Sequence, residues 1–205
     1  MNKKTFLTVS ATALAATLAL AGCAADPGSS GHGMPGMDHS TSAGSPSGTA
    51  TASAVLHNAA DTMFAQMMIP HHAQAVEMSD MILEKQDIPA PVRDLATRIK
   101  AAQGPEIETM TGWLKSWNES ATAHSGHGME GMMGESDMAK LEAAQGTEAA
   151  KLFLSQMITH HEGAVTMAKA ETADGVNPDA VNLSKVIVTA QEAEIVEMRN
   201  LLGTL

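Results

Sequence analysis

Cysteine and aromatic residues are scarce in this sequence of 205 residues, which has one Cys, no Tyr, two Trp and three Phe. A single Cys excludes a disulfide within the chain and any zinc site that needs several cysteines. So few aromatic residues also exclude a surface that stacks nucleic-acid bases. Basic residues are few as well: 12 Lys and Arg stand against 23 Asp and Glu, for a formal net charge of -11. No nucleic-acid partner is therefore expected, because phosphate neutralisation needs a basic patch.

The first 23 residues have the pattern of a secretory signal. Lys3 and Lys4 precede an uncharged stretch, residues 6–21, whose length and flanks do not suit a transmembrane helix. The stretch closes in LAGC, which resembles a bacterial lipobox, so Cys23 is expected to become a lipidated N-terminus. The sequence thus predicts an exported lipoprotein, held by acyl chains at the outer face of the cytoplasmic membrane or on the periplasmic side. The alternative is an ordinary signal with an incidental Cys.

Methionine and histidine are abundant, with 16 and nine residues. Some of them lie in two glycine-rich segments. One segment is part of residues 24–53, whose Gly, Ser, Thr and Pro predict a flexible, disordered tether. The other belongs to a loop expected over residues 118–137. The candidate metal ligands of these loops are His32, Met34, Met37 and His39 in the tether, and His124, His127, Met129, Met132 and Met133 in the second segment. The alternative is low-complexity filler.

The remainder of the chain contains an internal duplication. Residues 63–78 align with 152–167 at an offset of 89, and residues 95–114 align with 183–202 at an offset of 88. Apolar positions recur at three and four residues throughout, which predicts helices. We therefore expect an all-α fold over residues 54–205: a four-helix bundle made of two duplicated helical hairpins, residues 54–117 and 147–205.

Helix boundaries follow from local signals. Pro91 and Pro178 fit the first turn of a helix, with Asn177 as the N-cap of the last one. Gly146 and Thr147 open the third long helix, after a short helix near residues 138–144. Pro70 and Pro105 fall inside the first two helices, where bends are expected.

Polar residues repeat along with the apolar ones, which packing alone does not require. The candidate metal ligands of the bundle are His71, His72, His160, His161, Met68, Met78, Met157, Met167, Glu106, Glu194, Met110 and Met198. Gln103 and Gln191 repeat on the same stripe as the two Glu. A methionine at helical spacing is more often core filler than ligand, and one His of each adjacent pair could be solvated. A carboxylate next to the core needs a partner.

The donor set favours copper. Imidazole and carboxylate suit several transition metals, whereas thioether selects Cu(I) or Ag(I) over Mg, Ca and Mn. A copper ion, with Cu(I) favoured, is the expected ligand, and another transition metal remains an alternative. A protein that donates or accepts the metal is left open as a partner. The sequence does not decide whether the loops or the bundle hold the ion.

The motifs MMIPHHAQAVEM and QMITHHEGAVTMA, with the paired pattern Q..EI..M..WL, resemble the family called domain of unknown function 305. The resemblance covers about residues 56–202. It implies a ferritin-like four-helix bundle, often exported, with links to copper binding and copper resistance. It also implies that His71, His72, His160 and His161, with nearby Met, are the metal residues.

Two functional hypotheses follow. The first is a non-enzymatic copper-binding lipoprotein for homeostasis, buffering or resistance. The alternative is a ferritin-like oxidase that acts on a metal ion or at a dinuclear centre. Such centres use Glu-x-x-His motifs on two helices, but Met68, Ile69, Met157 and Ile158 stand three residues before the histidines. Binding is therefore favoured over catalysis. A structural surface module with incidental His and Met ranks last.

Overall fold

The computed structural model describes residues 56–122 and 129–205. The predicted signal and tether therefore lie outside the described residues, together with Cys23, His32, Met34, Met37, His39, His124 and His127. The expectations for these residues remain predictions.

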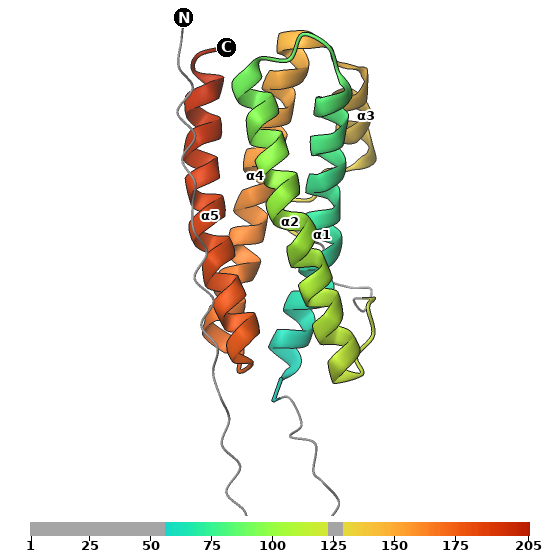
Figure 1. Cartoon of the computed structure of the whole chain (residues 1–205), viewed down its shortest axis with the longest axis vertical. Coiled ribbons are helices and arrows are strands. Elements are labelled where there is room, and N and C mark those ends of the chain that lie inside the picture. Colours follow the sequence, from blue (N-terminus) through green and yellow to red (C-terminus); the bar gives the residue numbers. More distant parts are fainter. Residues whose placement is uncertain (1–55, 123–128) are drawn as a thin grey trace, which may run out of the picture. The chain divides into compact units, whose positions relative to one another are not determined.

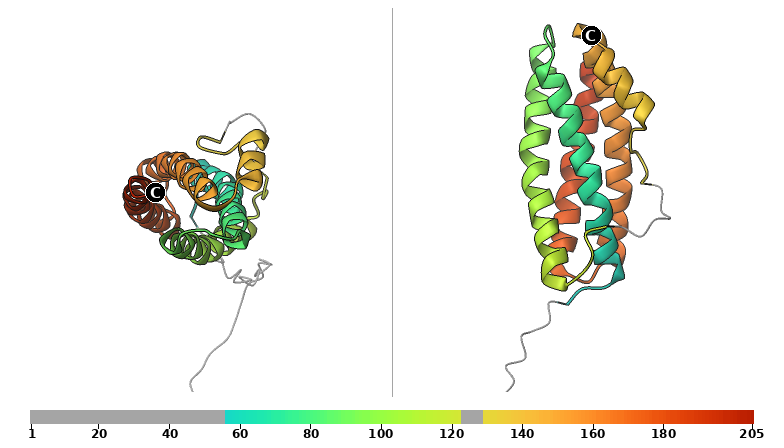
Figure 2. Two further views of the ribbon diagram at one scale, coloured as in Figure 1. Left: turned by 90° about the horizontal axis from the view of Figure 1, so that it is seen from above. Right: turned by 90° about the vertical axis from the view of Figure 1, so that its right-hand side faces the viewer.

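The described residues form five helices and no strand: α1 (Ala59–Glu84), α2 (Ala90–Trp117), α3 (Glu135–Ala143), α4 (Gly146–Asp174) and α5 (Pro178–Leu202). Four of them are long and lie alongside one another as a bundle, while the short α3 lies against its outside (Figures 1 and 2). The predicted all-α four-helix bundle is confirmed. No helix in the part of the chain that the structure describes is long and apolar enough to cross a membrane.

Capping residues define where the helices begin. Asn58 caps α1 by accepting hydrogen bonds from the amides of Ala60 and Asp61, and the Asp61 carboxylate accepts from the Asn58 amide in return. Asn177 caps α5 in the same way, as its position before Pro178 predicts. These bonds satisfy amides that have no partner within the helix.

Two prolines lie inside long helices. α1 continues through Pro70 and α2 through Pro105 without interruption. The bends expected there remain predictions.

The repeat appears as two hairpins. α1 packs on α2 and α4 packs on α5, and the hairpins meet chiefly where α1 contacts α4. α1 and α4 run in opposite directions (Figure 1). Corresponding positions of the two copies therefore face each other about an approximate twofold axis near the middle of this contact.

Buried apolar residues form two clusters. The first cluster contains Met78, Ile99, Phe153, Met157 and Met198, among others. The second cluster contains the repeat counterparts of four of them, since Phe64, Met68, Met110 and Ile187 correspond to Phe153, Met157, Met198 and Ile99. The clusters are thus images of each other under the duplication.

A buried carboxyl pair joins the start of α1 to the turn between α4 and α5. Asp61 accepts hydrogen bonds from the amides of Val176 and Asn177. Burial raises the pKa of Glu171 to about 8, and the nearby Asp61 adds to this. Burial also pushes the pKa of Asp61 upward, but hydrogen bonds from these amides, from Asn58 and from the Glu171 carboxyl outweigh it, so the pKa of Asp61 lies below its ordinary value. One proton shared by two carboxyl groups accounts for both shifts.

Candidate metal centre

A polar layer separates the two apolar clusters. On α1, His71 and His72 lie between Met68 of the second cluster and Ala75 of the first. On α4, His160 and His161 lie likewise between Met157 and Ala164. Gln103 and Glu106 on α2 and Gln191 and Glu194 on α5 complete the layer. The structure therefore brings the repeated polar residues of all four helices to one level of the bundle.

His71 and His160 form the centre of this layer. Their ring centroids are 3.7 Å apart and the rings are tilted by 41°. Because each residue is the repeat counterpart of the other, the approximate twofold axis passes between them. Burial, with the neighbouring histidines, lowers the pKa of His71 to about 3 and the pKa of His160 to about 2. Both imidazoles are therefore neutral at physiological pH, and neutral imidazole is the form that binds metals.

The other two histidines each meet a carboxylate. His72 Nε2 lies 2.7 Å from Glu106 Oε2, and His161 Nε2 lies 2.8 Å from Glu194 Oε2. The prediction that both Glu point at the core is consistent with these contacts. All four histidines are buried. The alternative in which one His of each pair is solvated is therefore wrong.

Several polar atoms of this layer are buried without a hydrogen-bond partner. These atoms are the Nδ1 of His71, His72, His160 and His161, the Nε2 of His160, and the Oε1 of Gln103 and Gln191. A buried polar atom without a partner costs about 1–3 kcal/mol. Such a concentration of them is unusual for a folded protein and calls for a ligand or water.

A short segment of the inter-hairpin loop, residues 129–134, crosses the α1–α4 contact at the level of the histidines. We call it the strap. Its Glu130 carbonyl lies 3.2 Å from His71 Nε2, and Gln74 exchanges two hydrogen bonds of 2.8 Å with the backbone of Met133. A Cβ atom on Gly163 would lie 2.1 Å from the Glu130 carbonyl oxygen. The strap therefore needs glycine at this position of α4.

The methionines take different places. Met68, Met78, Met110, Met157 and Met198 are fully buried in the apolar clusters, whereas Met167 is half-buried against the second cluster. Met129, Met132 and Met133 belong to the strap and are also half-buried. Packing accounts for the five buried methionines, whether or not they bind a metal.

In residues 56–122 and 129–205 no group of three or more His, Cys, Asp or Glu is placed to hold a metal ion.

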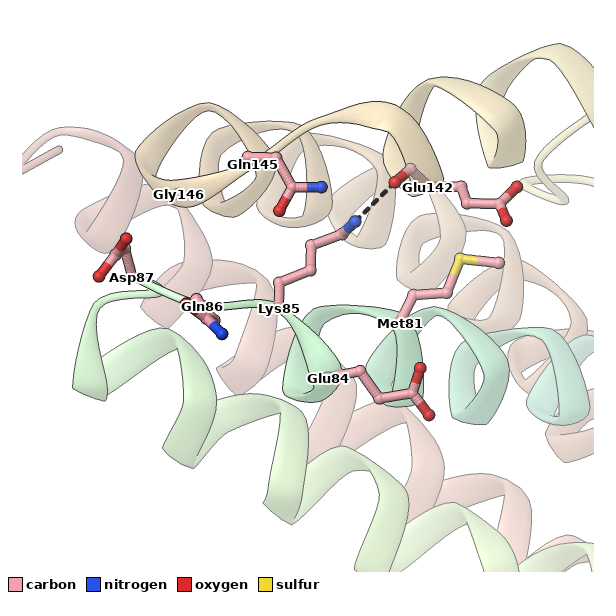
Figure 3. Close-up of a pocket in the computed structure, with 8 residues that line it drawn as sticks. All are labelled: Met81, Glu84, Lys85, Gln86, Asp87, Glu142, Gln145 and Gly146. Atoms are coloured by element: carbon pink, nitrogen blue, oxygen red, sulfur yellow. Dashed lines mark hydrogen bonds between the residues drawn. The ribbon is translucent and has the colours of Figure 1, made fainter.

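The end of the bundle carries a pocket of a different kind (Figure 3). Lys85 Nζ donates a 2.7 Å hydrogen bond to the Glu142 carbonyl across it. The side chains of Glu84 and Asp87 lie on opposite sides of this pocket and do not converge. No binding role is assigned to it.

The family model for DUF305, described as a domain of unknown function, matches residues 61–202. The chain belongs to the DUF305 family. A DUF305 protein from Streptomyces coelicolor, described as a candidate secreted protein, is 35% identical with a TM-score of 0.68, over 71% of this chain and 93% of that one. A DUF305 fragment from Deinococcus radiodurans is 31% identical with a TM-score of 0.66, over 72% and 98% of the two chains.

A third similar protein, CopM, has been solved in Cu(I)-bound and Cu(II)-bound forms. Both structures are 32% identical to this DUF305 chain, with a TM-score of 0.61, over 70% of it and 96% of CopM. Ag-bound and apo forms of CopM are similar at 30% identity. A search of curated protein sequences finds no match to this chain.

The sequence did not reveal the strap or its contacts. Gln74 and Gly163 are repeat counterparts, since 74 + 89 = 163, and both hold the strap. The only signal in the sequence was that one copy of the repeat has Gln at this position and the other has Gly. The structure explains the difference, because the strap contacts both positions.

Proposed function

We propose that this DUF305 protein is an exported, membrane-anchored protein that binds copper ions as cargo, for homeostasis, buffering or resistance, with the His71–His160 pair at its binding centre. Support comes from CopM, which binds Cu(I) and Cu(II) and is 32% identical over most of the chain. The lipobox-like sequence that ends at Cys23 supports export and a lipid anchor.

The observation that carries the proposal is His160, whose two ring nitrogens are buried and lack any hydrogen-bond partner. A neutral imidazole has one donor and one acceptor nitrogen. Its opposite ring, His71, also has an unpartnered Nδ1. A metal ion bound between these rings would give such nitrogens a partner, and the donor set suits copper.

The carboxylates fit a supporting role in this proposal. Metal-binding histidines commonly use one ring nitrogen for the metal and the other for a carboxylate, which fixes the tautomer and orients the ring. Glu106 and Glu194 contact the Nε2 atoms of His72 and His161, while the Nδ1 atoms remain without a partner. We therefore assign the two Glu to orientation of these rings, and the earlier expectation that they bind the metal directly takes second place.

Anaerobic titration of the full chain with Cu(I), Cu(II) and Zn(II) tests the proposal. The variant H71F/H160F replaces both rings by apolar groups of similar shape, so that neither ring faces an orphaned partner ring, although the Glu130 carbonyl loses its contact with His71. Replacing His57, outside the polar layer, by Gln gives a control. We expect tight Cu(I) binding in the parent and in H57Q, and at least about tenfold weaker binding in H71F/H160F.

Failure takes two distinct forms in this experiment. A parent chain that binds no copper overturns the function. Unchanged copper affinity and stoichiometry in H71F/H160F would place the ion outside the polar layer. Intact-mass measurement of membrane-extracted protein tests the anchor: acylated Cys23 as the first residue supports it, and water-soluble material that begins beyond Cys23 without lipid contradicts it.

A further inference from the structure

The contact between α1 and α4 extends beyond the strap on both sides, and its two halves differ. On the side of the first cluster, α3 packs on α1 and α4 and buries Leu141 in that cluster (Figure 2). On the side of the second cluster no helix of the described residues covers this contact, and a pocket of about 440 Å³ lies there. The duplication alone would have made both halves alike.

Thioethers and carboxylates line the uncovered half. Its lining includes Met63 and Met67 from α1, Met167, Glu171 and Asp174 from α4, and Glu130 from the strap, and no Lys, Arg or His. A pocket of this charge attracts cations and repels anions.

The repeat counterparts show that this lining is particular to one half. Met63 and Met67 correspond to Leu152 and Gln156, while Glu171 and Asp174 correspond to Ile82 and Lys85. The covered half thus has apolar, amide or basic side chains where the open half has sulfur and carboxylate. Core filling does not explain the difference, because Met63 is 45% exposed.

Glu171 adds a buried oxygen donor to this lining. The residue lines the pocket although it is only 2% exposed, and its carboxyl group shares a proton with Asp61. A bound cation would take the place of that proton, because metal ligands bind in their deprotonated form. Three nearby methionines supply soft sulfur donors, and soft donors select monovalent copper or silver over hard cations.

We propose that Met63, Met67, Met167 and Glu171 form a second binding site for a soft monovalent cation, Cu(I) or Ag(I), distinct from the histidine layer. Glu130 adjoins both sites, since it lines this pocket and its carbonyl lies 3.2 Å from His71 Nε2. The open pocket would receive an ion before it reaches the buried pair. This inference rests on the proposed copper function.

Titration of the full chain with Ag(I), followed by NMR of 13C-labelled methionine methyl groups, tests the site. The test variant is M63L/M67L, and E171Q removes a carboxyl oxygen donor at nearly constant size. The matched control is M81L/M138L, which removes two thioethers that pack against the first cluster, one on α1 and one on α3. Leu for Met is among the mildest changes of shape.

We expect Ag(I) to shift the methyl signals of Met63, Met67 and Met167. M63L/M67L should lose one equivalent of Ag(I), or bind it at least about tenfold more weakly, and E171Q should weaken the same equivalent. The control M81L/M138L should keep it. One outcome overturns the second site alone. In it, the parent chain binds Ag(I) and Cu(I) and H71F/H160F weakens this binding, but the Met63 and Met67 signals do not move and M63L/M67L binds as many ions as the parent. Absence of any Ag(I) or Cu(I) binding overturns the function as well.

Discussion

At the scale of the residue, the polar layer is governed by burial. His71 and His160 lie in contact without solvent, and a charge on either ring would be desolvated and would repel the other histidines. Both rings therefore stay neutral, and some of their nitrogens are buried without a hydrogen-bond partner. Such unpartnered nitrogens lower the stability of the metal-free fold.

The first prediction concerns the pH dependence of the metal-free protein. The pKa values of both histidines lie below the ordinary 6.5, so the unfolded chain takes up protons first as the pH falls. Their contribution to stability is present above pH 6.5 and is lost as the pH falls from there towards 3, by up to about 1.4 kcal/mol per pH unit for each histidine. Denaturant unfolding of the parent and of H71F/H160F between pH 8 and 5, with a chelator, measures it. Parallel pH profiles of the two proteins would contradict it.

The second prediction concerns the two carboxylates of the layer. E106Q and E194Q each leave a buried histidine with a weaker partner, because a hydrogen bond to a charged group is the stronger kind. Each should lower the free energy of unfolding by about 1–2 kcal/mol, and by similar amounts, since the two contacts are repeat counterparts. E108Q, at an exposed position of the same helix, is the control and should change little. Unequal losses would show that the halves differ in this layer.

At the scale of the element, the strap covers the contact between α1 and α4 at the level of the histidines. It gives His71 a carbonyl partner and is held by Gln74 on α1 and by close approach to Gly163 on α4. The sequence marked this segment only by its glycine and methionine content. Contacts between a loop and two helices are non-local, so periodicity carries no information about them. The helices, by contrast, follow from local patterns: Asn177 and Pro178 start α5 as their types predict.

The third prediction concerns the strap. G163A places a Cβ atom 2.1 Å from the Glu130 carbonyl oxygen, so the strap has to move away from α4. We expect faster amide hydrogen exchange in residues 129–134 and a loss of about 1–3 kcal/mol in the free energy of unfolding. G112A is the matched control, since its Cβ atom meets nothing within 4 Å. It should stabilise the protein by about 0.5–1 kcal/mol, as Ala does in a helix interior. Unchanged exchange in G163A would mean that the strap does not depend on this contact.

At the scale of the whole molecule, the duplication places one polar layer at the symmetry axis instead of one in each half. α1 and α4 supply the central pair, while α2 and α5 supply the carboxylates. The symmetry is broken outside the core, where α3 covers one half of the α1–α4 contact. A symmetric interior can thus coexist with two different surfaces.

The fourth prediction separates binding by the bundle from binding by the loops. An ion held in the bundle binds the folded chain only, so Ag(I) at 100 times its dissociation constant should stabilise the protein by about 2.7 kcal/mol. That corresponds to a rise of about 5–10 °C in the melting temperature for a protein of this size. An ion held by the His and Met of the two glycine-rich sequence segments, without any need for the folded bundle, binds folded and unfolded chains alike and gives no rise. Calorimetry with Ag(I), with Mg²⁺ as the control cation, distinguishes the two outcomes.

The sequence by itself determined the all-α class, the duplication, most helix boundaries and the set of polar residues that recur. These properties follow from periodicity and capping, which act within a few residues of the chain. Only the tertiary structure decided that His71 faces His160 and that Glu106 and Glu194 contact His72 and His161. It also decided that the strap and α3 cover different parts of the α1–α4 contact. The physical reason is that the antiparallel crossing of α1 and α4 brings together residues 89 positions apart, and this crossing is fixed by packing, which no local pattern records.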